Sequence, residues 1–171
     1  MRIDTIAEQY IEGLKALYHA EHQRLRILPA MARVATAPEL SSLFIGHISL
    51  VWMHLERLDI IFDGVKTEPL GKPNLKMASI LADSQCIIND EIPGRMKDAS
   101  LIGAAHRIKH YGVICYESLR GHASALGEHE AAVLLDRSLQ DEIAIGTHLA
   151  IVAECKPNMA ETLQTVGAQT M

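Results

Sequence analysis

The sequence predicts an all-α protein, a four-helix bundle with one long crossover between its second and third long helices. Apolar residues make up 49% of the chain and aromatic residues only 4%, a balance that suits helix-on-helix packing better than a sandwich or barrel. Apolar residues recur at spacings of three and four along four long stretches, which is the period of a helix buried on one face. Short turns join the first stretch to the second and the third to the fourth, so each pair is expected to be antiparallel.

The first helix is expected over about residues 4–36. Asp4 is the predicted N-cap, and Glu8 places an acidic group in the first turn. Pro29 should either kink the helix or end it, and the pattern alone leaves both open. The stripe consists of Ile6, Tyr10, Leu14, Leu17, Glu21, Leu25 and Leu28.

The second helix is expected over about residues 38–63. Pro38 stands at the first helical position, where its missing N–H does no harm, and Gly64 is the predicted C-terminal cap. Its stripe consists of Leu40, Leu43, His47, Val51, His54, Leu58 and Ile61.

Residues 64–97 interrupt the helical spacing of apolar residues and are predicted to form the crossover. The segment is too long for a hairpin connection between antiparallel neighbours, so it is expected to run the length of the bundle. Turn residues at 71–74 and 92–94 enclose a short helix over about residues 75–88.

The third long helix is expected over about residues 98–126, with Asp98 as its N-cap and Gly127 at its end. One edge of its buried face consists of Leu101, Ala105, Ile108, Gly112, Cys115 and Leu119. The positions beside that edge are Ile102, His106, Lys109, His110 and Val113.

The fourth long helix is expected over about residues 128–155, and Pro157 stops it. A capping box predicts a short last helix over about residues 159–167, which would dock on the bundle or on a second subunit. One crossover in the middle of four long helices is the ferritin-like arrangement, and residues 1–171 are expected to form one such domain. The fourth stripe consists of Leu135, Leu139, Glu142, Gly146, Leu149 and Val152.

Composition and charge exclude several classes of protein. The net charge of −5 argues against nucleic acid or an anionic membrane as partner. No apolar run reaches the roughly 18 residues of a membrane span, and no secretory segment is recognisable. The three cysteines are far apart and fit neither a disulfide framework nor a zinc ribbon. A soluble cytoplasmic protein is therefore expected.

One ionisable residue lies on or beside the stripe of each long helix, at matching heights. Glu21 lies about sixteen residues before the first short turn and His54 about seventeen after it, so the two should face each other. His110 lies about seventeen residues before Gly127 and Glu142 about fifteen after it. Because ionisable side chains in a core are costly unless paired or metal-bound, the four predict a polar site inside the bundle.

Carboxylate and imidazole groups suit iron, manganese or zinc, so the site predicts one such ion per subunit, or none if it is degenerate. His47, two turns from His54, is a secondary candidate ligand, and His106 is another. The two-metal template requires Glu-x-x-His on two helices, and the sequence contains no such motif. Lys109, beside His110, favours the degenerate alternative, because a buried ammonium would repel a cation and replace its charge.

The sequence contains no motif typical of other enzyme chemistries. The sequence contains no GxSxG elbow, no P-loop and no dinucleotide fingerprint. Cys115 falls on a buried face, where it is expected to act as a small hydrophobe. The pairs His19/His22 and His122/His129 lie near helix edges or ends and are interpreted as solvated surface. No catalytic residue is assigned.

Four stretches of the chain resemble the YciE/YciF family of bacterial ferritin-like stress proteins. They are "LYHAEHQRLRILPAMA" (17–32), "LFIGHISLVWMHLERLDIIF" (43–62), "DASLIGAAHRIKHYGVICYESLRGHASALG" (98–127) and "LLDRSLQDE" (134–142), within a likeness that spans about residues 8–150. The resemblance implies a bundle that pairs into a homodimer, induction under stress, and similarity to rubrerythrin and manganese catalase.

The resemblance also implies metal-site positions. They correspond to Glu21, to Leu50 or His54, to Lys109 and His110, and to Glu142. Family members commonly carry Glu where this chain has Leu50 and Lys109, so two carboxylates are replaced.

Three functional interpretations follow. The leading one is a stress-response protein without catalysis, which keeps a degenerate interior site. The alternative is a metal-dependent oxidoreductase, using iron or manganese, that acts on peroxide or oxygen, with Glu21 and Glu142 as ligands and His54 and His110 completing the site. The third is an interaction protein that binds a partner through its surface or through the tail after Pro157.

Overall fold

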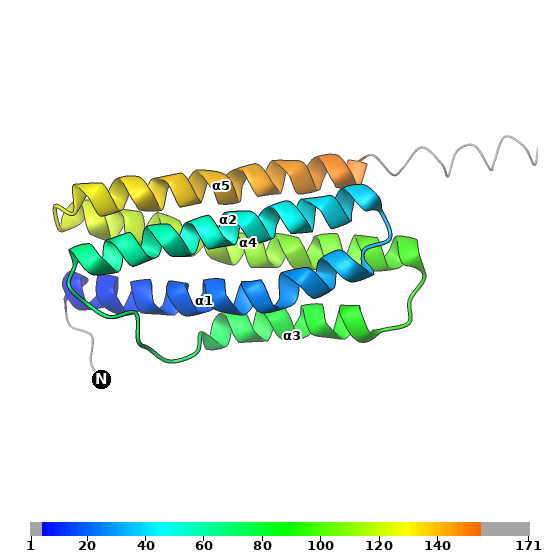
Figure 1. Cartoon of the computed structure of the whole chain (residues 1–171), viewed down its shortest axis with the longest axis horizontal. Coiled ribbons are helices and arrows are strands. Elements are labelled where there is room, and N and C mark those ends of the chain that lie inside the picture. Colours follow the sequence, from blue (N-terminus) through cyan, green and yellow to red (C-terminus); the bar gives the residue numbers. More distant parts are fainter. Residues whose placement is uncertain (1–4, 155–171) are drawn as a thin grey trace, which may run out of the picture.

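The computed structural model describes residues 5–154 and confirms the predicted all-α, ferritin-like bundle with one crossover. Helices α1, α2, α4 and α5 lie side by side along the long axis of the molecule, and the crossover between α2 and α4 carries α3 (Figure 1). Helix α3 packs against α1 and α4 on the outside of the bundle. The bounds are Ile6–Val34 for α1, Pro38–Gly64 for α2, Leu75–Asn89 for α3, Gly94–Ala125 for α4 and His129–Glu154 for α5.

Helix α1 begins with a capping box at Thr5, one residue after the N-cap predicted at Asp4. The N-cap is Thr5, whose Oγ1 accepts from the Glu8 N–H at 3.1 Å, while the Glu8 carboxylate accepts from the Thr5 N–H at 3.1 Å. Asp4 lies outside the described residues. Helix α1 continues through Pro29 to its end at Val34, so Pro29 does not end it.

Asp98 does not cap α4, and that prediction is wrong. Helix α4 begins at Gly94, and Asp98 is buried inside it with 1% of its surface exposed. Its carboxylate accepts from the Thr36 N–H at 2.8 Å, from Thr36 Oγ1 at 2.7 Å and from the Ala37 N–H at 3.0 Å. The turn between α1 and α2 lies at the same end of the bundle as the start of α4. The Asp98 carboxylate therefore caps this turn and not its own helix.

The helix ends near the other turns differ in detail from the prediction. Gly64 is the last residue of α2 rather than its cap, and the left-handed conformation after it belongs to Lys66, with φ 52°. Gly127 does adopt a left-handed φ of 76° after α4, as a terminating glycine should. The predicted stop at Pro157 and the short helix over 159–167 lie outside the described residues.

The core consists of two apolar clusters with a polar layer between them. The cluster nearer the α1–α2 turn includes Phe44, Met31 and Leu101, and the other includes Tyr10. Along each bundle helix one cluster gives way to the other at mid-height, for example between Ile145 and Leu139 on α5. The polar side chains described next lie at that boundary. No helix within residues 5–154 is both long enough and apolar enough to cross a membrane.

Candidate functional site

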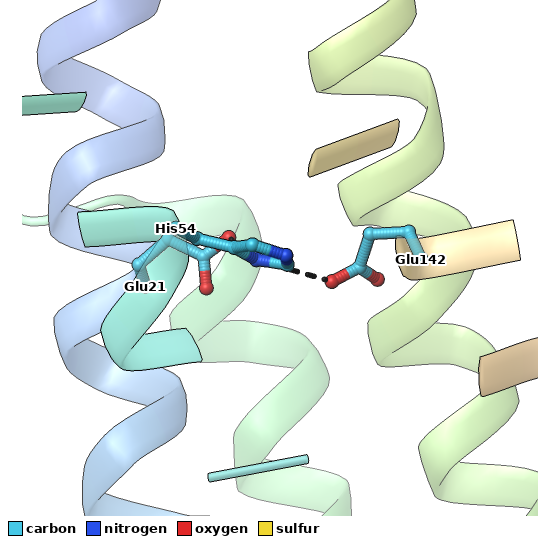
Figure 2. Close-up of side chains that lie close together, drawn as sticks. All are labelled: Glu21, His54 and Glu142. Atoms are coloured by element: carbon cyan, nitrogen blue, oxygen red, sulfur yellow. Dashed lines mark ion pairs between the residues drawn. The ribbon is translucent and has the colours of Figure 1, made fainter. Parts of the chain in front are cut away.

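Three of the four residues predicted at mid-height converge inside the bundle. Glu21 on α1, His54 on α2 and Glu142 on α5 are each 0% exposed. His54 Nδ1 lies 3.5 Å from Glu21 Oε1 and 3.7 Å from Glu142 Oε1. Figure 2 shows the Glu21 and His54 side chains pointing toward Glu142 from across the bundle. One potential ligand atom from each residue lies within 4.8 Å of the others.

Arg24, which is not among the predicted site residues, lies at the centre of this cluster. Its side chain is 1% exposed. Nη1 donates to Glu21 Oε1 at 2.9 Å, and Nη2 donates to Glu142 Oε1 at 2.6 Å. The guanidinium therefore bridges the two carboxylates, using the same oxygens that face His54.

Two further buried side chains complete the layer. His47 on α2 is 2% exposed, and its Nε2 forms a hydrogen bond with Arg24 Nη2. Tyr116 on α4 is fully buried, and its hydroxyl donates to Glu21 Oε1 at 2.8 Å. Each of the four bundle helices thus contributes at least one polar side chain to the same layer.

The layer continues toward the surface between α2 and α5. His54 Nε2 lies 3.4 Å from Asp141 Oδ2, and the Asp141 side chain is 27% exposed. The same oxygen accepts from Arg57 Nη1 at 2.6 Å, and Arg57 also donates to Ser138 Oγ at 3.1 Å. A chain of polar contacts therefore runs from Glu21 through His54 to a half-buried ion pair.

The electrostatic environment keeps the carboxylates ionised. Burial alone would raise the pKa of Glu142, but the charge of Arg24 outweighs it and lowers that pKa to about 2. The pKa of Glu21 is lowered in the same way by Arg24 and His54 against its burial. Burial and the two carboxylates raise the pKa of Tyr116 well above its usual value, so its hydroxyl stays a donor.

The remaining predicted site residues lie elsewhere. His110 is exposed, so its predicted place in the interior layer is wrong. The buried face of α4 centres on Ile108, Gly112 and Tyr116, which turns His110 toward solvent.

Lys109 and His106, both on α4, are half-buried outside the cluster. Lys109 packs against Gly146 of α5, where an added Cβ would lie 2.8 Å from its Nζ. Within residues 5–154 no ion pair joins Lys109 to Glu21 or Glu142, so Arg24 and not Lys109 supplies the internal cation. Burial and the charge of Lys109 lower the pKa of His106.

The residues present do not fit a two-metal centre. Two carboxylates and one imidazole offer fewer ligands than the carboxylate-rich template requires. The guanidinium of Arg24 already bonds the inward-facing oxygens of both carboxylates. A divalent ion at that point would meet a fixed positive charge at contact distance, which is unfavourable in a buried site.

A sequence signal for Arg24 did exist. It stands three residues after Glu21 and four before Leu28, so it shares their helix face. The predicted stripe contains Leu25 at this step and not Arg24. The structure leaves Leu25 half-buried at the edge.

Comparisons with known proteins extend over nearly the whole chain. The family model described as Domain of unknown function (DUF892) matches residues 5–163. Protein YciF of Escherichia coli (strain K12) is 29% identical over 154 residues, which cover 90% of this chain and 93% of YciF.

Solved structures show the same relationship. The crystal structure of the E. coli stress protein YciF matches with a TM-score of 0.85 and 28% identity, covering 88% of this chain and 95% of that chain. YcfI from Rhodopseudomonas palustris matches with a TM-score of 0.83 and 26% identity, covering 86% and 94%. A protein from Xanthomonas campestris, at 18% identity and a TM-score of 0.70, shares the fold and covers 95% and 99%. These matches agree with the resemblance seen in the motifs of the four long helices. The chain belongs to the DUF892 family, among its YciF-type members.

Proposed function

We propose that this chain is a ferritin-like stress-response protein without catalytic activity, in which Arg24 stands where a metal ion would otherwise bind. The observation that carries the proposal is the double ion pair of Arg24 with Glu21 and Glu142, at 2.9 Å and 2.6 Å. Both carboxylates are neutralised from within the protein, so a cation from solution has little to gain there. The role in stress is supported by the similarity to the E. coli stress protein YciF.

The buried layer then acts as a structural element. A buried charged group is costly unless its partners are in place, and here the partners come from different helices. Sliding α1 by one turn against α5 would separate Arg24 from Glu142 and leave the buried Glu142 carboxylate without its guanidinium partner. We infer that the layer fixes the register of the bundle helices.

The second candidate is the metal-dependent oxidoreductase acting on peroxide or oxygen. One observation favours it: Glu21 Oε2, Glu142 Oε2 and His54 Nδ1 are buried and have no hydrogen-bond partner within residues 5–154. These atoms belong to the three residues that could hold one ion. This candidate requires Arg24 to withdraw from the carboxylates.

Metal analysis separates the two candidates. We expect protein purified without chelators, from cells supplied with iron and manganese, to hold far less than one ion per chain by plasma mass spectrometry. We also expect no peroxide consumption after addition of Fe(II) or Mn(II). A full equivalent of iron or manganese that disappears in the double variant Glu21→Ala/Glu142→Ala would overturn the proposal.

The variant Arg24→Ala provides the positive control. Removing the guanidinium leaves Glu21, His54 and Glu142 as a donor set for one ion. Titration with Co(II), followed by visible absorption, should then detect binding that the unmodified chain lacks. Binding of Co(II) by both proteins with equal affinity would contradict the assigned role of Arg24.

We also propose that the chain forms a homodimer through one face of α2. Support comes from four exposed apolar side chains that share a stripe of this helix: Ile45 at 58%, Trp52 at 55%, Met53 at 44% and Ile60 at 52% exposure. Trp52, Met53 and Ile60 follow Ile45 by seven, eight and fifteen residues. This spacing places the four side chains within about 100° around the helix axis. Contiguous exposed apolar stripes are typical of association surfaces.

A cytoplasmic location belongs to the same proposal. It is supported by Cys86 and Cys115, which are both free, and of which Cys86 is exposed. Exposed thiols persist in reducing compartments and tend to be oxidised elsewhere.

A further inference from the structure

We propose that the groove between the first half of α2 and the last half of α5 binds a small neutral molecule with an apolar body and one hydrogen-bond-accepting oxygen. This site borders the polar layer at His47 and goes beyond the function proposed above. Its volume of about 480 Å³ is in the range of small-molecule pockets. The walls are mainly apolar and include Leu43, Gly46, Leu50, Ile145 and Ile151, with His47 as the buried polar residue.

His47 identifies the polar part of the ligand. Its Nε2 faces the guanidinium of Arg24, which can only donate, so Nε2 must accept and the ring proton belongs on Nδ1. Nδ1 is buried and has no hydrogen-bond partner within residues 5–154. A buried N–H without a partner is unfavourable, so a ligand seated against His47 gains if it brings an accepting oxygen to this atom. Burial and Arg24 also lower the pKa of His47, which keeps the ring neutral.

The charges around the groove favour a neutral ligand. Neither Lys nor Arg is among the residues that line it, and Glu39 is the acidic residue there. A carboxylate or phosphate would meet Glu39, and the lining holds no permanently charged cation to compensate it, with His148 as its other exposed ionisable residue. A ligand cation at His47 would lie close to the fixed positive charge of Arg24, which bonds the other nitrogen of the ring. A ketone, aldehyde, ester or quinone with an apolar body is neutral and supplies the accepting oxygen.

Two isosteric probes test the assignment on the full chain. Acetylnaphthalene carries a carbonyl oxygen, and isopropenylnaphthalene has the same shape with a methylene group in its place. We expect saturable binding of the acetyl compound by calorimetry, and about tenfold weaker binding of the isopropenyl compound, since one buried hydrogen bond is at stake. In protein with nitrogen-labelled histidine, only the acetyl compound should shift the Nδ1–H resonance of His47.

Matched variants separate binding in the groove from binding elsewhere. A Cβ at Gly46 would meet no atom within 4 Å, so Gly46→Leu fills the groove without disturbing the core. We expect it to weaken binding of the acetyl compound at least about tenfold. Gly121→Leu on α4 is the control, because Gly121 is equally unobstructed and lies away from the groove. His47→Phe should abolish the preference for the acetyl over the isopropenyl compound.

Three results would overturn the inference. They are equal affinity of the two probes for the unmodified chain, binding that Gly46→Leu leaves unchanged, and binding that appears only after residues 155–171 are deleted. The last result would mean that the segment after α5 occupies the groove. None of these measurements involves a metal ion, so their failure is distinct from failure of the proposed function.

Discussion

Gly112 on α4 directly faces the carboxylate of Glu142 on α5. A Cβ at Gly112 would lie 2.8 Å from Glu142 Oε2 and 3.4 Å from Arg24 Nη1. The first distance is closer than van der Waals contact allows, so the polar layer has its present form because this position has no side chain. The spacing of α4 and α5 at mid-height and the placement of the ion pair are therefore linked.

Gly112→Ala should destabilise the protein. The new methyl group must displace a buried carboxylate held by Arg24, and overpacking of this kind costs about 1–3 kcal/mol, offset in part by the better helix propensity of Ala. Urea unfolding followed by circular dichroism measures the change. Gly121→Ala on the same helix should instead stabilise by about 0.5–1 kcal/mol, because its Cβ meets nothing. A neutral or stabilising Gly112→Ala would mean that the layer is loosely packed.

Arg24→Met should be among the most destabilising single substitutions. It leaves Glu21 and Glu142 buried without their cation, and breaking a buried pair in this way costs about 3–5 kcal/mol. Arg26→Met makes the same change on an exposed position of α1 and should alter stability by no more than about 0.5 kcal/mol. Equal unfolding midpoints in denaturant for the two variants would contradict the ion-pair layer.

Acid should weaken the bundle through the same carboxylates. The pKa of Glu142 is lowered from 4.5 to about 2 in the folded protein, so folding favours its ionised form. The resulting stability is complete above the unfolded pKa and is lost as the pH falls through the folded pKa, between about pH 5 and pH 2. Glu142→Gln should be less stable at neutral pH and should lose less stability over this interval. Glu117→Gln, on an exposed position of α4, should keep the parent slope in a series of denaturant titrations.

Tyr116→Phe and Tyr10→Phe should differ, although both rings are buried. The Tyr116 hydroxyl donates to Glu21 Oε1 at 2.8 Å, and losing a hydrogen bond to a charged group costs about 1.5–3 kcal/mol. The Tyr10 hydroxyl is buried without a hydrogen-bond partner within residues 5–154, so its removal should be neutral or stabilising. Thermal unfolding of the two variants gives the comparison, and a larger loss for Tyr10→Phe would reverse the expected order.

Association should depend on the apolar stripe of α2. Trp52→Arg places a charge in the middle of that stripe, and we expect it to convert a dimer into a monomer in sedimentation equilibrium. Ile114→Arg makes a similar change on α4, where Ile114 is 64% exposed and outside the stripe, and should leave the dimer intact. A parent chain that sediments as a monomer would refute the proposed dimer.

Much of the fold followed from local pattern. The period of apolar residues located the long helices, and Pro38 and Gly127 marked ends that the structure retains. Counting residues from the first short turn placed Glu21 and His54 at one height because helix rise is constant. Asp98 was misassigned because its partners at Thr36 and Ala37 are distant in sequence, and a local rule describes only local hydrogen bonds.

The order of the helices, their approximate lengths and the presence of a buried polar layer were determined by the sequence alone, since each depends on spacing along one chain. Only the tertiary structure decided which cation neutralises the two carboxylates of the layer. The rotation of α4 turns His110 outward and brings Tyr116 inward, while α1 directs Arg24 between carboxylates from two helices. A helix can present a wide face, and a residue at its edge is buried or exposed according to how its neighbours pack against it.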